Sequence, residues 1–325
     1  MKRILFLTLA LFALCAAAAA AEGGVFSYRF ADAQEAAALL VANDAYYDGL
    51  SENDIAYRLQ KLGGTRAELL AFAAAQTLDY TAEEKAAVDD AMSFIEQVCA
   101  ERGYVLPPTD GIVFAKTTML EECGAGAYTH GTQVYLGRDI LQYATMDDDR
   151  TRIFFREIVA HELFHCLTRN HPEFRTAMYA ILGFTVADAD YPLPPSVRNA
   201  MISNPDVERH NACAAFEIDG KMRNCVVVFL AGKPFEQPGD SFSDGMVTGL
   251  VPVDDLSALY TSEDAANFWD VFGRNTDYVI DPEETLADNF RFTIVYGPDV
   301  EYPTPEIIRA IDALLTGAAY TAEAA

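Results

Sequence analysis

The strongest constraint on this fold is the segment 146–170, MDDDRTRIFFREIVAHELFHCLTRN, which predicts one long helix. Its three leading aspartates favour a helix start, because the helix dipole stabilises negative charge there. Pro172 disfavours helical geometry at the residue before it, so we expect the helix to end near Asn170. Apolar side chains cover most of its circumference, as is typical of a buried helix. The fold must therefore be built around this segment.

This apolar helix carries His161, Glu162 and His165, although the chain has only five histidines. Burying these polar groups without partners would cost several kcal/mol. His161 and His165 are four residues apart, so both rings project from one helix face. That spacing suits two imidazole nitrogens binding one Zn²⁺. Glu162 is placed to reach a water on the metal as general base, which is the H-E-x-x-H pattern.

A catalytic zinc ion needs a third protein ligand, and His171 is one candidate. It follows His165 by six residues, which gives a spacing similar to that of the metzincins. Those enzymes place a glycine where this chain has Thr168, since the backbone turns sharply there. His171 could instead be an ordinary residue at the helix end.

Glu284 is the second candidate for the third ligand. The segment 281–297 predicts a later helix with Asp281 as its cap, and Asp288 lies one turn beyond Glu284. A glutamate can bind zinc while an aspartate one turn on accepts the N–H of a ligating histidine. Alternatively, Glu284 could serve as a capping-box glutamate opposite Asp281.

The motifs HELFH (161–165) and EETLADN (283–289) together resemble the gluzincin metallopeptidases, whose second motif is Glu-x-x-x-Asp. The resemblance implies a zincin-like core in which a small sheet and its edge strand lie beside the active-site helix. It also implies zinc held by His161, His165 and Glu284. The segment GTQVYLG (131–137) is the expected edge strand, which would pair with peptide substrate. No subfamily is assigned.

The resemblance also implies a mechanism. Zn²⁺ would lower the pKa of its bound water and polarise the scissile carbonyl. Glu162 would take the proton of that water and pass it to the leaving amine. A donor to the oxyanion is expected, and the sequence leaves four candidates: His130, His210, Tyr278 and Tyr296.

The chain divides into an export signal, a helical region and a catalytic region. Residues 1–21 combine a basic start, an apolar stretch and an alanine tract, as in signal peptides. Acylation at Cys15 would be the lipoprotein alternative. Residues 22–106 predict a helical N-terminal layer with a supporting role. Residues 107–325 predict the zincin-like region, in which a β-rich stretch at about 200–262 separates the two metal motifs. The expected fold class is α+β.

Charge and hydropathy exclude several classes of partner. Without Lys2 and Arg3, the 23 basic residues fall to 21 against 49 acidic ones, a formal charge of −28. This excess argues against nucleic acid and against anionic lipid. No second run of eighteen apolar residues follows the signal, so we expect no integral membrane segment in the mature chain. Export permits disulfides, with Cys213–Cys225 and Cys99–Cys123 as candidate pairs.

These observations predict an exported zinc metallopeptidase that acts on peptides or proteins. Two alternatives remain. One is a catalytically inactive zincin-fold binding protein of the cell envelope, although such a protein has no need of Glu162 as a base. The other is a metal-dependent hydrolase of non-peptide amides, which would gain nothing from an edge strand.

Overall fold

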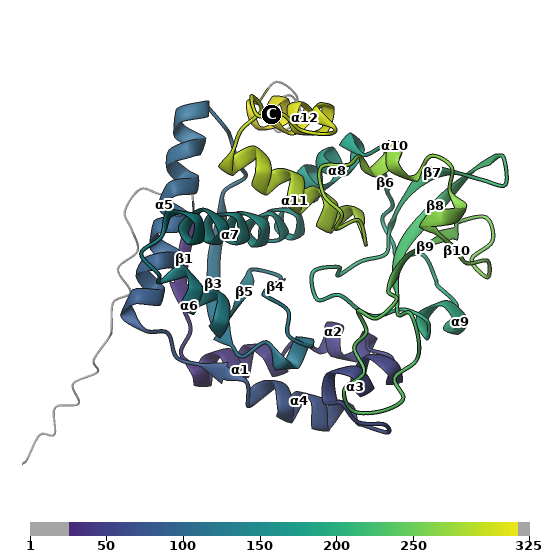
Figure 1. The fold of residues 1–325 in the computed structure, drawn as a ribbon, viewed down its shortest axis with the longest axis horizontal. Helices are drawn as coiled ribbons and strands as arrows, with labels where there is room; N and C mark the ends of the chain where they lie inside the picture. Colours follow the sequence, from purple (N-terminus) through teal and green to yellow (C-terminus); the bar gives the residue numbers. More distant parts are fainter. Residues whose placement is uncertain (1–25, 318–325) are drawn as a thin grey trace, which may run out of the picture.

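The computed structural model describes residues 26–317, so the expected signal at 1–21 and Cys15 lie outside the described residues. The fold is mixed α+β with two separate sheets, and the long helix expected from the sequence lies between the first sheet and the C-terminal helices (Figure 1). The expected α+β class is confirmed.

The first sheet contains the strand order β1-β3-β5-β4. β1 (Phe26–Phe30), β3 (Thr109–Thr117) and β5 (Gln133–Gly137) are parallel, and β4 (Ala127–His130) pairs antiparallel with β5. The short β2 (Thr77–Leu78) pairs antiparallel with the end of β3. Segment 131–137 was expected to be the edge strand, and this expectation is wrong: β5 is internal and β4 is the edge.

The error has a physical reason. β4 has only four residues and follows the glycine-containing segment 123–126, so it shows too little alternation to be recognised as a strand. Its pairing with β5 is made possible by a tight hairpin at Gly131 and Thr132, where Gly131 adopts a left-handed φ of 60°.

Helices dominate residues 30–102, as expected, together with the two strands β1 and β2. Figure 1 shows the first four of these helices along one side of the molecule, below the sheet. The helices of this region are α1 (Ala33–Val41), α2 (Asp44–Gly49), α3 (Glu52–Leu59), α4 (Arg66–Ala74) and α5 (Ala82–Arg102). Thr81 caps α5 with Glu84 in a capping box, and Ser51 caps α3.

The central helix is α7 (Asp149–Asn170), which packs against α5 and α11. Asp148 caps it by accepting the backbone N–H groups of Arg150 and Thr151. The helix ends at Asn170, as Pro172 predicts, and Pro172 begins the next helix, α8 (Pro172–Ile181). Before α7 lie a 3₁₀ turn, η1 (Leu120–Glu122), and α6 (Arg138–Ala144).

The second sheet is antiparallel, with the order β10-β9-β8-β7-β6. Four of its strands lie in the stretch 200–262, which was expected to be β-rich. The strands are β6 (Thr185–Val186), β7 (Ala212–Ile218), β8 (Lys221–Leu230), β9 (Val247–Pro252) and β10 (Tyr260–Thr261). In the β7–β8 hairpin Cys213 pairs with Val226, so Cys213 and Cys225 face opposite sides of the sheet. All five cysteines in residues 26–317 are free thiols.

The remaining helices complete the C-terminal part. They are α9 (Pro195–Arg198), η2 (Ser262–Asp264), α10 (Phe268–Phe272), α11 (Pro282–Val295) and α12 (Pro305–Leu315). Asp281 caps α11 through the N–H of Glu283, and Pro282 occupies its first position. α11 lies along α7 (Figure 1), and the side chains of its first turn are buried. Among the helices of residues 26–317, none is both long enough and apolar enough to cross a bilayer.

Candidate metal centre

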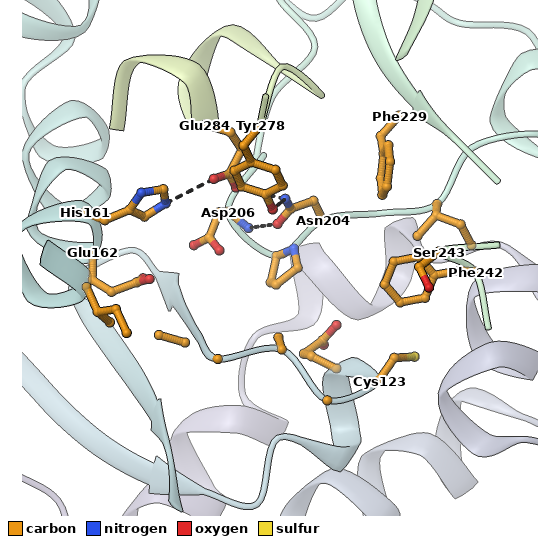
Figure 2. A pocket seen from close by; sticks show the side chains of 18 of the residues that line it. Cys123, His161, Glu162, Asn204, Asp206, Phe229, Phe242, Ser243, Tyr278 and Glu284 are labelled. Atoms are coloured by element: carbon orange, nitrogen blue, oxygen red, sulfur yellow. Dashed lines mark hydrogen bonds and ion pairs between the residues drawn. The ribbon is translucent and has the colours of Figure 1, made fainter. Parts of the chain in front are cut away.

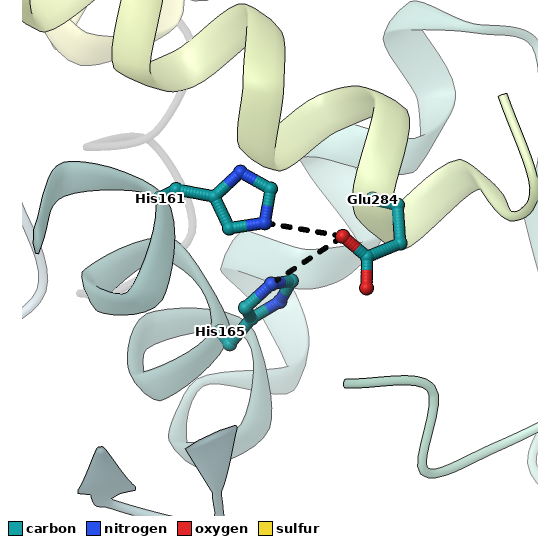
Figure 3. Close-up of side chains that lie close together, drawn as sticks. All are labelled: His161, His165 and Glu284. Atoms are coloured by element: carbon teal, nitrogen blue, oxygen red, sulfur yellow. Dashed lines mark hydrogen bonds and ion pairs between the residues drawn. The ribbon is translucent and has the colours of Figure 1, made fainter. Parts of the chain in front are cut away.

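Three predicted ligands converge where α11 packs on α7. The Nε2 atom of His161 lies 3.1 Å from Oε2 of Glu284, and Nε2 of His165 lies 3.9 Å from the same oxygen. Figure 3 shows both rings turned toward the glutamate from successive turns of α7. All three side chains are buried, and His165 is inaccessible to solvent. One carboxylate oxygen therefore faces two imidazole nitrogens, and the three atoms lie close enough together to bind one metal ion.

The ring of His161 is oriented by Asp288, the residue expected for this role. Nδ1 of His161 lies 3.0 Å from Oδ1 of Asp288. Thr276 donates to the other oxygen of Asp288 at 2.5 Å, and Arg291 approaches Oδ1 at 3.0 Å. With its Nδ1–H donated to this carboxylate, the ring of His161 points Nε2 toward Glu284, where a metal ion would replace the Nε2 proton.

The ring of His165 is oriented by Glu283, a residue that was not expected at the site. Nδ1 of His165 lies 3.0 Å from Oε1 of Glu283. Thr168 donates to the same oxygen through a short hydrogen bond, and the Tyr179 hydroxyl donates to Oε2 at 2.7 Å. Two consecutive glutamates at the start of a buried helix were the only signal in the sequence. Nε2 of His165 is buried and has no hydrogen-bond partner among the described residues.

These residues fit a zinc ion. Two ligand atoms in a tetrahedral shell, each about 2.0–2.1 Å from Zn²⁺, lie roughly 3.4 Å apart. The distances of 3.1 and 3.9 Å bracket that value. Two imidazoles and one carboxylate form a known catalytic zinc set with a fourth position for water or substrate. The partnerless Nε2 of His165 is the kind of buried acceptor that a metal would satisfy.

The electrostatic potential of the site also favours a cation. Burial lowers the pKa of His161, but the hydrogen bonds that its ring donates to Asp288 and Glu284 outweigh burial and hold the pKa well above that of an ordinary imidazole. Burial likewise opposes ionisation of Glu283, yet its hydrogen bond with His165 lowers the pKa of Glu283 to about 2. A site that stabilises positive charge on its histidines also favours a divalent ion bound to the histidine nitrogens in place of a proton.

Glu162 lies beside the three ligands and points into the same space (Figure 2). Its Oε2 accepts a hydrogen bond from Thr129 Oγ1 on β4 at 2.7 Å. Asp206 also lies here: its Oδ1 accepts the backbone N–H of Thr129 at 2.7 Å and lies 3.9 Å from Nε2 of His165. Burial and repulsion from Glu162 raise the pKa of Asp206 well above its ordinary value. No local pattern of residues marks Thr129 or Asp206 as part of the site.

A cavity of about 630 Å³ opens from this site. It extends from the metal ligands past residues 124–127, at the start of β4. At its far side lie Phe229 and Phe242 (Figure 2). Its apolar lining includes Ile140, Phe154, Ile158, Phe229, Phe242 and Met246. The cavity is large enough for several residues of an extended peptide.

The N-terminal helices help to hold this site. Asn204 donates to Oε1 of Glu284 at 2.8 Å, and its neighbour Ser203 is fixed by α3. Asp54 accepts the Ser203 N–H at 2.7 Å, and Arg58 donates to the Ser203 carbonyl at 2.8 Å. Arg58 is buried and also pairs with Glu122 at 2.6 Å. A polar cluster on α3 therefore fixes Ser203, the neighbour of the residue that donates a hydrogen bond to Glu284.

The structure does not bring His171 to the other two histidines. His171 ends α7, and its Nε2 lies 3.2 Å from Thr109 Oγ1 on β3. It is not part of the group formed by His161, His165 and Glu284. The metzincin-like spacing requires a sharp turn at Thr168, but Thr168 is helical and α7 continues to Asn170.

Of the four candidate oxyanion donors, the structure brings Tyr278 to the cavity. Its hydroxyl lies 3.2 Å from Asn204 Nδ2, close to Glu284 (Figure 2). His130 is buried among the rings of three tyrosines, His210 lies outside this cavity, and Tyr296 bonds Glu157.

We compared the chain with family models, curated proteins and solved structures, and none of them matches it.

Proposed function

We propose that this protein is a zinc-dependent metallopeptidase with a zincin-like core, exported by its N-terminal segment 1–21. The observation that carries the proposal is the convergence of His161, His165 and Glu284 on one point, with Glu162 beside them and an edge strand at the same cavity. This combination supplies a metal site, a base and a surface for a peptide backbone.

Each residue of the site has a role in this proposal. His161, His165 and Glu284 would hold the ion, while Asp288 and Glu283 orient the two rings. When bound, Zn²⁺ would acidify a water and polarise the scissile carbonyl. Glu162, steered by Thr129, takes the proton of the attacking water and delivers it to the leaving amine.

The position of β4 supports a peptide substrate over a non-peptide amide. β4 is an edge strand, so the main-chain groups on its outer side are open to pairing wherever side chains of the protein do not fill them. An extended peptide would gain backbone hydrogen bonds there, whereas a small amide would not. The hydrogen bond that orients Glu162 supports catalysis over a binding role, since a purely binding zincin fold does not need an oriented base.

Metal analysis of four proteins tests the proposal: wild type, Glu284→Ala, His171→Ala and Glu162→Gln. We expect one zinc per chain in the wild type and in His171→Ala, loss of zinc in Glu284→Ala, and retained zinc with lost peptide hydrolysis in Glu162→Gln. Zinc retained by Glu284→Ala and lost by His171→Ala would instead support the metzincin-like ligand set. Full hydrolysis by Glu162→Gln would refute its role as base.

The substrate class is tested by comparing peptides with non-peptide amides of similar size. Hydrolysis confined to the non-peptide amides would favour the alternative hydrolase, and zinc binding without any hydrolysis would favour the inactive binding protein.

A further inference from the structure

The outer side of the edge strand is already filled at one end by side chains of the protein. The Thr129 N–H is donated to Asp206 at 2.7 Å, and the Thr129 carbonyl accepts from Arg169 at 2.7 Å. The N–H of Gly131, just beyond β4, is donated to Glu208 at 3.0 Å. A peptide therefore cannot pair with this end of the strand.

The other end of β4 faces the cavity. Main-chain groups two residues apart along a strand point the same way, so those of Ala127 face outward like those of Thr129. Ala127 and the three residues before it line the cavity of about 630 Å³. A bound peptide would thus extend from the metal ligands in one direction only, along residues 127 to 124.

The segment that closes the blocked end contains Asp206. Residues Pro205 and Asp206 line the main cavity, while Asp206, Val207 and Glu208 line a separate pocket behind it. The segment therefore forms a wall between the two spaces. Asp206 is only 6% exposed, and Figure 2 shows its carboxylate facing the space between His161 and Glu162.

The Asp206 carboxylate has one oxygen to offer a ligand. Its contacts with Thr129, His165 and Arg169 all involve Oδ1. Oδ2 has no hydrogen-bond donor among residues 26–317. A carboxylate oxygen that opens into the cavity next to the metal ligands, at the closed end of a cleft, can take a cationic or hydrogen-bond-donating partner.

Resting on the peptidase function proposed above, we propose that Asp206 binds the α-ammonium group of the substrate, so that the enzyme is an aminopeptidase that removes the first residue of a peptide. The α-nitrogen of a residue lies about 2.5 Å from its own carbonyl carbon. With that carbonyl at the metal ligands, the α-nitrogen falls beside Asp206, whose Oδ1 is 3.9 Å from Nε2 of His165. Asp206, Arg169 and Glu208 already bond the outer main-chain groups of Thr129 and Gly131, so a residue preceding the first one would find no strand to pair with.

Charge decides which end of a peptide lies against this wall. Arg169 lies 3.7 Å from Asp206 Oδ1, and its other donors go to the carbonyls of Thr129 and Asp206 and to the Glu208 carboxylate. The two arginines that line the cavity are also paired with carboxylates, Arg58 with Asp54 and Glu122 and Arg291 with Asp288. Asp206 and Glu162 are two carboxyl groups that repel each other, and an ammonium group placed beside them would relieve that repulsion, which favours an amino terminus over a carboxyl terminus. A peptide that starts at Asp206 and continues toward Ala127 runs antiparallel to β4, a pairing that edge strands readily make.

A binding experiment tests this inference without turnover. The hydrolysis-deficient Glu162→Gln protein is titrated calorimetrically with two pentapeptides of identical sequence, one with a free amino terminus and one Nα-acetylated, both amidated at the carboxyl end. We expect the free peptide to bind about tenfold to a hundredfold more tightly, as a charge-assisted hydrogen bond contributes. Asp206→Asn, added to Glu162→Gln, should remove this preference while zinc content stays unchanged.

Asp190→Asn is the matched control, because Asp190 is an exposed aspartate of the same connection and pairs with Arg209 outside the cavity. It should leave the preference intact. Equal affinity of the two peptides for Glu162→Gln would overturn the inference even if Asp206→Asn does not fold. Loss of zinc in Asp206→Asn would also overturn it, because Asp206 would then be a metal ligand.

Product analysis by mass spectrometry separates this inference from the general proposal. The zinc-loaded wild type should release the first residue of the free peptide and leave the acetylated one uncut. Internal cleavage of the acetylated peptide would refute the aminopeptidase inference and support the peptidase function. If neither peptide is cut, the peptidase proposal fails, and the calorimetric preference alone decides whether Asp206 recognises an amine.

Discussion

Glu283→Gln is the substitution that most directly tests how the buried carboxylates prepare the metal site. The Glu283 carboxylate accepts hydrogen bonds from His165 Nδ1, Thr168 and Tyr179. Glutamine keeps the size of the side chain but loses the charge and replaces one acceptor oxygen by a donor. The ring of His165 then loses the partner that fixes its tautomer and direction, while the three ligands themselves are unchanged.

The expected magnitude follows from the role of such partners. Loss of a group that orients a ligating histidine weakens metal binding by about 10–100-fold, which corresponds to roughly 1.4–2.7 kcal/mol. Competition with a chromophoric chelator of known zinc affinity measures this change. Asp288→Asn, which acts on His161, should give a loss of the same order.

Glu173→Gln provides the control, since Glu173 is an exposed glutamate in the first turn of α8 and has no contact with the ligands. It should bind zinc like the wild type. Zinc affinity in Glu283→Gln equal to that of this control, in a protein with an unchanged circular dichroism spectrum, would refute the argument that Glu283 prepares His165.

Two further predictions concern stability and turnover. The pKa of Glu283 is lowered from 4.5 to about 2, so its contribution to folding is present above pH 4.5 and is lost as the pH falls toward 2. In metal-free protein, the difference in unfolding free energy between wild type and Glu283→Gln should reach at most about 3 kcal/mol at pH 6 and shrink by pH 3. Urea titrations followed by Trp269 fluorescence measure this difference. A difference that stays constant with pH would contradict the lowered pKa of Glu283. Thr129→Val removes the hydroxyl that donates to Glu162 and should lower kcat by about 10–100-fold with zinc content unchanged. Steady-state kinetics together with metal analysis check this. An unchanged kcat would mean that Glu162 does not need the Thr129 hydroxyl.

The sequence by itself determined those features whose cause lies within a few residues along the chain, such as where a helix begins and ends. The limits of α7 follow from Asp148 at its start and Pro172 after its end, and the spacing of His161 and His165 places both rings on one face. In the same way, Asp281 and Pro282 start α11. Caps, prolines and periodicity act over a few residues, so they can be read without knowing the fold.

Only the tertiary structure decided which distant groups meet. The packing of α11 on α7 brings Glu284 and Glu283 to histidines more than a hundred positions earlier, and it leaves His171 beside β3. Asp206 bonds Thr129, which lies 77 positions earlier in the chain. Thr129 belongs to the edge strand β4, which is too short to be recognised from the sequence. A buried polar contact of this kind is set by the packing of helices and sheets that are remote in the chain. No local pattern of residue types encodes it, so the partners of the metal site become visible only in three dimensions.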